Sequence, residues 1–297
     1  MTIRTVAVCG SGVLGSQIAF QTAFHGFDVR VYDINDEAIT RARATMQGLQ
    51  ERYQQDIQAT PEQTQAAQGR LSFFTDLGEA VRGVELVIEA IPEVIDLKRD
   101  FYQKLGAIAD LDTIFATNTS TLLPSNLMEA TGRPERFLAL HFANQIWVNN
   151  TAEIMRTPRT DDAVFDQVVA FAKDIGMVAL PLHKEQPGYI LNTLLVPLLG
   201  AALELVVKGV ADPHTVDKTW MVATGAPRGP FAILDVIGLT TPYNINMAAA
   251  AQGDEGRGAV AQYLKEQYID RGKLGIATGE GFYTYPNPAY LQQDFLK

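Results

Sequence analysis

The feature that most constrains the fold of this chain is a glycine-rich turn set between two apolar runs near the N-terminus. Residues 6–9 form the first run, Gly10-Ser11-Gly12-Val13-Leu14-Gly15 follows it, and a second run, residues 29–32, ends at Asp33. Two parallel strands joined by a helix, with the glycines at the first strand-to-helix turn, are the structure that this pattern predicts. We therefore expect the chain to begin with a wound α/β domain.

Each of the three glycines has a physical reason to lack a side chain. Gly10 permits the tight turn after the strand, Gly12 lets the backbone approach a pyrophosphate, and Gly15 allows the helix to pack close to the sheet. The helix that begins near Gly12 points backbone N–H groups and its positive dipole end at the phosphates. We expect Val13 and Leu14, in its first turn, to belong to this dinucleotide site.

Asp33 extends the site to the adenosine ribose. At the end of the second predicted strand, its carboxylate can accept hydrogen bonds from the ribose hydroxyls and would repel a 2′-phosphate, which favours NAD over NADP. The alternative is a structural turn in another α/β protein. The strand, helix and acidic residue in the expected order favour NAD.

The composition is that of an ordinary globular protein with room for two domains. Of its 297 residues, 47% are hydrophobic and 20% charged. A formal net charge of −10 argues against nucleic acid or an anionic membrane as the main partner. The single cysteine, Cys9, is expected to be a small buried residue in a reducing compartment. The pattern shows no secretory signal, so we expect a cytoplasmic protein. We also expect no metal site.

Strands and helices are expected to alternate after Asp33. The polar segment 35–69 predicts two antiparallel helices, with Thr60 as N-cap and Pro61 at the first helical position. Helical periodicity follows at 94–109 and 161–175. Short apolar runs that predict strands lie at 71–74, 85–88, 113–116, 137–140, 152–155 and 177–180. This alternation predicts a mainly parallel sheet.

A polar, proline-flanked stretch, 181–188, predicts a domain boundary. We expect a Rossmann-type NAD-binding domain at 1–183 and an all-helical domain for substrate binding and dimerisation at 184–297. Helical patterns lie at 189–208, 212–223, 230–237, 241–251 and 259–271. The first is apolar enough to suggest a membrane span, but Asn192, Pro197 and Glu204 interrupt it, which favours a buried or homodimer-interface helix.

The candidate reacting groups lie at the carboxyl ends of predicted strands, where α/β sheets bind their ligands. Asn118-Thr119-Ser120 follows one strand, His141 follows another, and Glu153 lies on the next. His141 and Glu153 would face each other if their strands pair. The other histidines, at 25, 183 and 214, are expected to be surface or capping residues.

At this point the chain resembles the 3-hydroxyacyl-CoA dehydrogenase family, including short bacterial 3-hydroxybutyryl-CoA dehydrogenases. The resemblance rests on ordered motifs along nearly the whole chain. They are Gly10-Ser11-Gly12 with Asp33, residues 87–93, Asn118-Thr119-Ser120, His141-Phe142, Glu153, residues 187–192, Gly229-Pro230-Phe231 with Asp235, and residues 279–283.

The resemblance implies a role for each matching residue. His141 would be the general acid/base and Glu153 would orient it, while Ser120 and Asn192 would bind the substrate oxygen. Cofactor-side positions match Glu89, Lys98 and Asn118, and Asn144 falls in the substrate loop. The implied activity is reversible NAD-dependent oxidation of a short-chain L-3-hydroxyacyl-CoA to the 3-oxoacyl-CoA, in fatty acid metabolism.

The chemistry of these residue types supports the same reaction without the resemblance. Oxidising a secondary alcohol requires removal of the hydroxyl proton as hydride leaves the carbon, and a neutral imidazole accepts that proton near neutral pH. Hydrogen bonds from Ser120 and Asn192 would stabilise alkoxide character. Simpler interpretations remain open: Ser120 as a turn cap, Asn192 as a helix-end hydrogen bond, and Lys98 as a solvated helix charge.

Two departures from the family pattern bear on the substrate. Acyl-CoA members read His-Phe-Phe-Asn-Pro, whereas this chain reads His141-Phe142-Ala143-Asn144-Gln145-Ile146-Trp147. Segment 35–69 contains no lysine to meet CoA phosphates; the cations that could substitute are Arg41, Arg43, Arg52 and Arg70. A free hydroxy acid, as in the related gulonate dehydrogenases and lambda-crystallins, is therefore a second hypothesis. A non-catalytic NAD-binding protein is a third, disfavoured because all four catalytic residues are present.

Overall fold

The computed structural model describes residues 3–297 and divides into two compact units, one ending at Ile190 and one running from Leu191 to Lys297. The sequence-based boundary between 183 and 184 lies in the loop that precedes α8 (Tyr189–Val207). The division by contacts falls in the first turn of that helix. Each unit has a hydrophobic core of its own.

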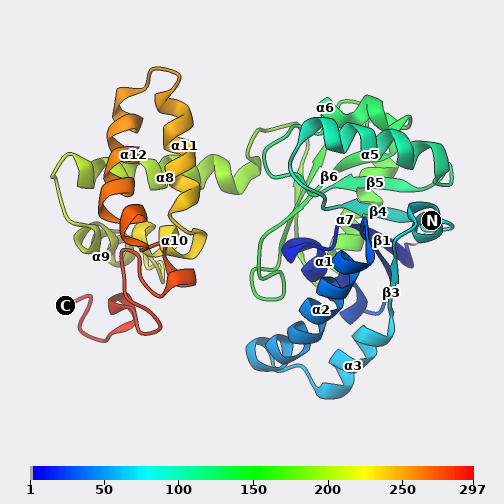
Figure 1. Cartoon of the computed structure of the whole chain (residues 1–297), viewed down its shortest axis with the longest axis horizontal. Helices are drawn as coiled ribbons and strands as arrows, with labels where there is room; N and C mark the ends of the chain where they lie inside the picture. The colour runs from blue at the N-terminus through cyan, green and yellow to red at the C-terminus, as the bar shows by residue number, and fades with distance from the viewer. Residues whose placement is uncertain (1–2) are drawn as a thin grey trace. The chain divides into compact units, whose positions relative to one another are not determined.

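The first unit is built on one eight-stranded sheet with the order β3-β2-β1-β4-β5-β6-β7-β8 (Figure 1). All neighbouring strands are parallel except β6 and β7, which are antiparallel. The strands are β1 (Thr5–Cys9), β2 (Asp28–Tyr32), β3 (Leu71–Phe74), β4 (Leu86–Glu89), β5 (Ile114–Thr117), β6 (Phe137–Phe142), β7 (Thr151–Arg156) and β8 (Val178–Leu182). The predicted Rossmann-type wound sheet is confirmed.

Helices connect the parallel strands. They are α1 (Val13–Phe24), α2 (Asp36–Ile57), α3 (Pro61–Gly69), α4 (Leu77–Val81), α5 (Ile95–Ile108), α6 (Ser125–Met128) and α7 (Asp162–Asp174). Of these, α2, α3 and α4 begin at side-chain caps. Thr60 and Gln63 form a reciprocal capping box at α3, as the Thr-Pro pair predicts. Helices α4 and α6 were not predicted, because a helix of four or five residues shows too little periodicity in the sequence.

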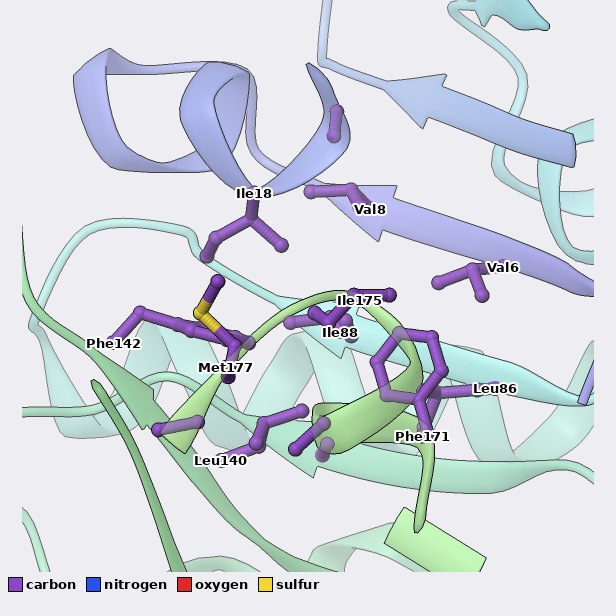
Figure 2. Packing of buried hydrophobic residues seen from close by; sticks show 14 of the residues in the cluster. Val6, Val8, Ile18, Leu86, Ile88, Leu140, Phe142, Phe171, Ile175 and Met177 are labelled. Atoms are coloured by element: carbon purple, nitrogen blue, oxygen red, sulfur yellow. The ribbon is translucent and has the colours of Figure 1, made fainter. Parts of the chain in front are cut away.

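Buried side chains on both faces of the sheet hold the strands and helices together. Along β1, Val6 and Val8 lie in the cluster that α1 and α7 cover, whereas Ala7 and Cys9 lie in the cluster that α5 covers. Figure 2 shows Ile18 directed from α1 into the first of these clusters, which also contains Val8. This two-sided burial explains why the strands read as continuous apolar runs. Cys9 is fully buried, as predicted.

The second unit is helical, which confirms the predicted class of this part. Its helices are α8, α9 (Pro213–Thr224), α10 (Pro230–Ile237), α11 (Thr240–Ala250) and α12 (Glu255–Gln267). The last begins at Glu255 rather than at 259 as predicted, because the Asp254 side chain accepts a hydrogen bond from the Arg257 N–H and caps it. Gly256 and Gly258 in its first turn conceal that start in the sequence.

Two buried aspartates organise the second unit. Asp217 accepts hydrogen bonds from the Phe231 and Ala232 backbone and from the Tyr283 hydroxyl. Asp235 similarly accepts from the backbone of residues 282 and 283 and from the Tyr285 hydroxyl. Burial raises the pKa of both carboxyl groups. Their hydrogen bonds offset part of the cost of burying charge and fix the turn at 281–283.

Helix α8 is the one helix in residues 3–297 that is long and apolar enough to cross a membrane, with a mean hydropathy of 2.1. Leu199 and Leu203 pack into the core of the second unit. Other apolar side chains of this helix are exposed, including Leu194 at 68%. The helix therefore has a core-facing side and an exposed apolar side.

Candidate active site

Antiparallel pairing of β6 and β7 brings the predicted base and its carboxylate together. His141 lies directly opposite Glu153 in the register, and His141 Nδ1 is 3.2 Å from Glu153 Oε2. Both side chains are buried, with 9% and 5% exposed. An ionised carboxylate only accepts hydrogen bonds, so Nδ1 carries the proton of a neutral ring and Nε2 carries the lone pair.

Ser120 completes a chain of three side chains. Its Oγ lies 3.1 Å from His141 Nε2 and donates to that lone pair. Ser120 follows β5, His141 lies near the end of β6, and Glu153 lies on β7. These three strands are neighbours in the sheet. An oxygen of a bound substrate within reach of both Ser120 Oγ and His141 Nε2 would find a donor and a proton acceptor side by side.

Glu93 holds the loop that carries Ser120, and the sequence analysis assigned it no role. Glu93 Oε1 accepts hydrogen bonds from the Ser120 and Thr121 N–H groups and from the Thr119 and Thr121 hydroxyls. Burial alone would raise the pKa of Glu93. The hydrogen bonds and the Lys98 charge outweigh burial and lower this pKa to about 2. The carboxylate therefore stays ionised and keeps the loop in place across the working pH range.

Lys98 is buried and paired, so its interpretation as a solvated helix charge is wrong. Its side chain is 1% exposed, and Nζ lies 2.5 Å from Glu89 Oε1 and 3.2 Å from Glu93 Oε2. Glu89 is fully buried, and its second oxygen accepts bonds from the Tyr102 and Thr117 hydroxyls. Glu89 thus pairs with Lys98 inside the protein, whereas Lys98 and Glu93 also line the cavity that is described next.

A cavity of about 270 Å³ runs from the glycine-rich turn to Ser120. Besides the N-terminus of α1, its walls include Ile91, Glu93, Lys98 and Asn118. Among the predicted cofactor residues, Gly12, Val13, Leu14, Gly15, Lys98 and Asn118 line it. A helix N-terminus at one end and the serine of the reacting group at the other suit an anionic cofactor that reaches the base.

The three glycines differ in what a side chain would meet. A Cβ on Gly10, where φ is +96°, would lie 2.6 Å from the Ala90 carbonyl oxygen, and one on Gly15 would lie 1.9 Å from the Gly10 oxygen. A Cβ on Gly12 would meet no atom within 4 Å. Packing therefore requires glycine at positions 10 and 15, whereas Gly12 opens onto space that fits a pyrophosphate.

Asp33 is held ready for a ribose. Its Oδ2 accepts from the Ser11 N–H at 2.8 Å and the Ser11 hydroxyl at 2.6 Å, and its Oδ1 accepts from the Ile34 N–H. A carboxylate offers about four acceptor positions, so one remains for a ribose hydroxyl. Together with the open space at Gly12, this arrangement fits NAD.

The three predicted asparagines lie in different places. Asn118 Oδ1 accepts a hydrogen bond from the Phe142 N–H and ties the end of β5 to the end of β6. Asn144 is exposed, and its carbonyl accepts from the Asn149 side chain. Asn192 is half-buried in the first turn of α8 and belongs to the second unit.

The loop that follows His141 is anchored to α2. The Trp147 ring packs against Tyr53 with 5.3 Å between ring centroids, and its Nε1–H donates to Asp56 Oδ2 at 2.9 Å. Arg52 pairs with the same oxygen at 3.1 Å. The Gln145 N–H donates to the Gln17 side chain of α1. These contacts fix the segment in which the sequence departs from the family pattern.

We expect Trp147→Phe to raise KM for the carbonyl substrate about 3- to 10-fold and to leave the Kd for NADH within about 2-fold, because it removes one hydrogen bond that fixes this loop. Steady-state kinetics and NADH titration measure the two effects. Trp220→Phe, in α9, is the matched control for loss of a tryptophan and should change neither constant. An unchanged KM in Trp147→Phe would contradict the role given to this loop.

The sequence matches family models over most of its length. The model described as 3-hydroxyacyl-CoA dehydrogenase, NAD binding domain, matches residues 5–186, and the model of the C-terminal domain matches residues 188–285. Hydroxyacyl-coenzyme A dehydrogenase, mitochondrial, of Rattus norvegicus is 33% identical over an alignment of 291 residues that covers 95% of this chain and 91% of the rat protein.

Two further proteins are similar across almost the whole chain. The probable 3-hydroxybutyryl-CoA dehydrogenase of Bacillus subtilis (strain 168) is 32% identical over 288 residues, 96% of this chain and 98% of that protein. A solved structure of a diketoreductase, described as acting in substrate-directed dual catalysis of dicarbonyl compounds, is 57% identical. It covers 96% of this chain and 100% of its own, with a TM-score of 0.92.

Proposed function

The chain belongs to the 3-hydroxyacyl-CoA dehydrogenase family and is an NAD-dependent oxidoreductase, and from this premise we propose that it interconverts short-chain L-3-hydroxyacyl-CoA and 3-oxoacyl-CoA. The observation that carries the proposal is the hydrogen-bonded series Ser120–His141–Glu153, whose serine lines the cavity that begins at the glycine-rich turn. Base and cofactor cavity are thereby joined in one unit of the fold.

His141 moves the proton in this proposal. Its Nε2 accepts the proton of the substrate hydroxyl as the C–H bond breaks, and in the reverse direction the imidazolium returns a proton to the carbonyl oxygen. Bound NAD supplies the hydride acceptor. Glu153, 3.2 Å from Nδ1, fixes the ring tautomer and stabilises the imidazolium charge.

Ser120 holds the substrate oxygen in the first unit. The Ser120 hydroxyl can turn its donor from His141 Nε2 to that oxygen when the substrate is present, and alkoxide character strengthens such a bond. Asn192 is assigned as the second donor by its position after the Pro-Gly pair. Glu93, paired with the buried Lys98, keeps the Ser120 loop rigid, so the oxygen is held without reorganisation during the reaction.

A second candidate substrate is a dicarbonyl compound, or its hydroxy acid, that lacks CoA. The four arginines near the helical arm are already engaged. Arg41 pairs with Glu37, Arg52 pairs with Asp56, Arg43 lies over the Phe73 ring, and Arg70 donates to the Ala23 carbonyl. CoA phosphates would therefore compete with these contacts for a cation. The 57%-identical diketoreductase points to the same class of substrate.

Three substrates, assayed by NADH consumption, separate the candidates. We expect turnover of acetoacetyl-CoA. The N-acetylcysteamine thioester of acetoacetate lacks the nucleotide part of CoA, and we expect its kcat/KM to be lower by less than about 10-fold. The reason is that the arginines are already engaged, so the nucleotide adds little binding free energy. A larger loss would assign CoA recognition to this chain. A free 1,3-diketo ester with higher kcat/KM than both thioesters would favour the second candidate. Turnover of none of the three would leave a non-catalytic NAD-binding protein.

We further propose that the protein is a cytoplasmic homodimer of fatty acid metabolism. The exposed apolar side of α8 supports the dimer, because Leu191, Leu194 and Leu205 would leave water if a second copy covered them. The chain's net charge of −10 is consistent with a small-molecule substrate rather than nucleic acid.

A further inference from the structure

Tyr189 covers the imidazole of His141, and the reaction described above gives it no part. Its ring is 1% exposed. The centroids of the two rings are 4.4 Å apart and their planes differ by 20°, so the rings are stacked. A buried aromatic ring in this position excludes water from one face of the base and restricts rotation of the imidazole.

The same side chain also reaches the loop that carries Ser120. The Tyr189 hydroxyl donates to the Thr119 carbonyl oxygen at 2.7 Å, one residue before Ser120. Burial raises the pKa of this hydroxyl, so it stays protonated and remains a donor at any working pH. One side chain therefore contacts His141 itself and the residue before Ser120, and so acts on both sides of the 3.1 Å contact between Ser120 Oγ and His141 Nε2.

The next residue contacts the third member of the series. The Ile190 N–H donates to Glu153 Oε1 at 2.8 Å, while Glu153 Oε2 faces His141. Two consecutive residues at the end of the first unit thus contact the base, the serine loop and the carboxylate. These three contacts come from one short segment, although their partners belong to β6, to β7 and to the loop after β5.

The backbone here adopts an unfavourable conformation to make these contacts. Gly188 has φ +79° and Tyr189 has φ +57°, and a bulky residue in the left-handed region is an outlier. Such strain persists only where the surrounding contacts over-determine it, most often at functional sites. The strain directs the tyrosine ring onto His141 and the following N–H onto Glu153.

We propose that Tyr189 is a positioning residue for the dehydrogenase reaction, one that fixes the imidazole plane by stacking and sets the Ser120–His141 separation through its bond to Thr119. The inference rests on the proposed function for its kinetic consequences, but the stacking itself can be tested without turnover. Tyr189 makes no contact with substrate in this proposal and acts through Ser120 and His141.

The hydroxyl is tested by Tyr189→Phe, alone and combined with Ser120→Ala. We expect Tyr189→Phe to lower kcat about 3- to 10-fold with the Kd for NADH unchanged, and we expect no further loss when it is added to Ser120→Ala. A structural role would give losses that multiply, and that outcome would overturn the proposal. Tyr283→Phe removes a comparable buried bond, to Asp217, and should lower the unfolding temperature without changing kcat.

The ring is tested by histidine NMR, which needs no turnover. His141→Gln identifies the imidazole C–H signal of His141 among the four histidines. We expect Tyr189→Leu to move that signal by loss of the ring current, and we expect Tyr189→Phe to leave it nearly in place. An unmoved signal in a folded Tyr189→Leu protein would overturn the stacking. If Tyr189→Leu does not fold, the kinetics of Tyr189→Phe and its double variant decide. Turnover of no substrate by the unmodified enzyme would reject the proposed function, while the NMR result would stand separately.

Discussion

His141→Ala is expected to lower kcat by about 10²- to 10⁴-fold while the Kd for NADH stays nearly unchanged. The imidazole is the group whose Nε2 faces Ser120 Oγ at 3.1 Å, so alanine removes the proton acceptor and leaves the glycine-rich turn intact. Glu153 would then lie buried beside an empty space, because it contacts the ring at Nδ1, whereas Ser120 faces the other nitrogen, Nε2. Stopped-flow or steady-state NADH oxidation gives kcat, and fluorescence titration gives the Kd.

The matched control for this change is His183→Ala. His183 is exposed in the segment between β8 and α8, and its ring contacts Phe165 rather than the site. Its loss should leave both constants unchanged. If His141→Ala retains more than about one tenth of the original kcat, the assignment of the base is wrong. If it loses NADH binding as well, the two functions are coupled more closely than the separate contacts indicate.

The sequence was sufficient to predict the positions of the strands and of the reacting groups, but not all of their contacts. Apolar runs separated by helical periods predicted every strand of the sheet to within two residues at its ends. Apolar runs do not reveal strand direction, since a buried strand reads the same in either orientation. The sequence therefore predicts a contact between His141 and Glu153 only if their strands pair. The antiparallel register of β6 and β7 places the two residues opposite each other.

The supporting residues were harder to predict because their contacts are distant in sequence. Lysine on a helix is usually solvated, and nothing in its neighbours indicates that Lys98 would be enclosed by Glu89 and Glu93. Glu93 lies in the same sequence motif as Glu89, so the motif marks it as a candidate site residue. The sequence does not show which of these two carboxylates faces the cavity. The stacking of Tyr189 depends on a left-handed φ that no pattern of a tyrosine predicts.

The loop after His141 illustrates a third kind of limit. The departure from the family pattern was visible at Trp147, and it predicted an altered pocket. The partner of this tryptophan, Asp56, is at the end of α2 and 91 residues away in sequence. Only the packing of α2 against the rest of the unit brings that carboxylate to the indole N–H.

Gly12→Val is expected to weaken NADH binding at least about 100-fold while the protein stays folded. The two effects separate because a Cβ on Gly12 meets no protein atom within 4 Å, so the side chain occupies space that the fold itself does not use. The φ of −63° at Gly12 is one that valine adopts without strain. Circular dichroism and the unfolding temperature should match those of the unmodified protein, and NADH titration should show the loss.

Gly15→Val gives the opposite pattern and makes the prediction sharper. A Cβ on Gly15 would lie 1.9 Å from the Gly10 carbonyl oxygen, which is backbone and cannot move aside without displacing α1 from the sheet. This variant should lose stability as well as NADH binding, because the close approach of helix and turn is a packing requirement. If Gly12→Val binds NADH as tightly as the unmodified protein, the pyrophosphate does not approach the backbone at Gly12. If Gly12→Val unfolds like Gly15→Val, the open space beside Gly12 is not available to a side chain, and the separation of binding from folding at this turn fails.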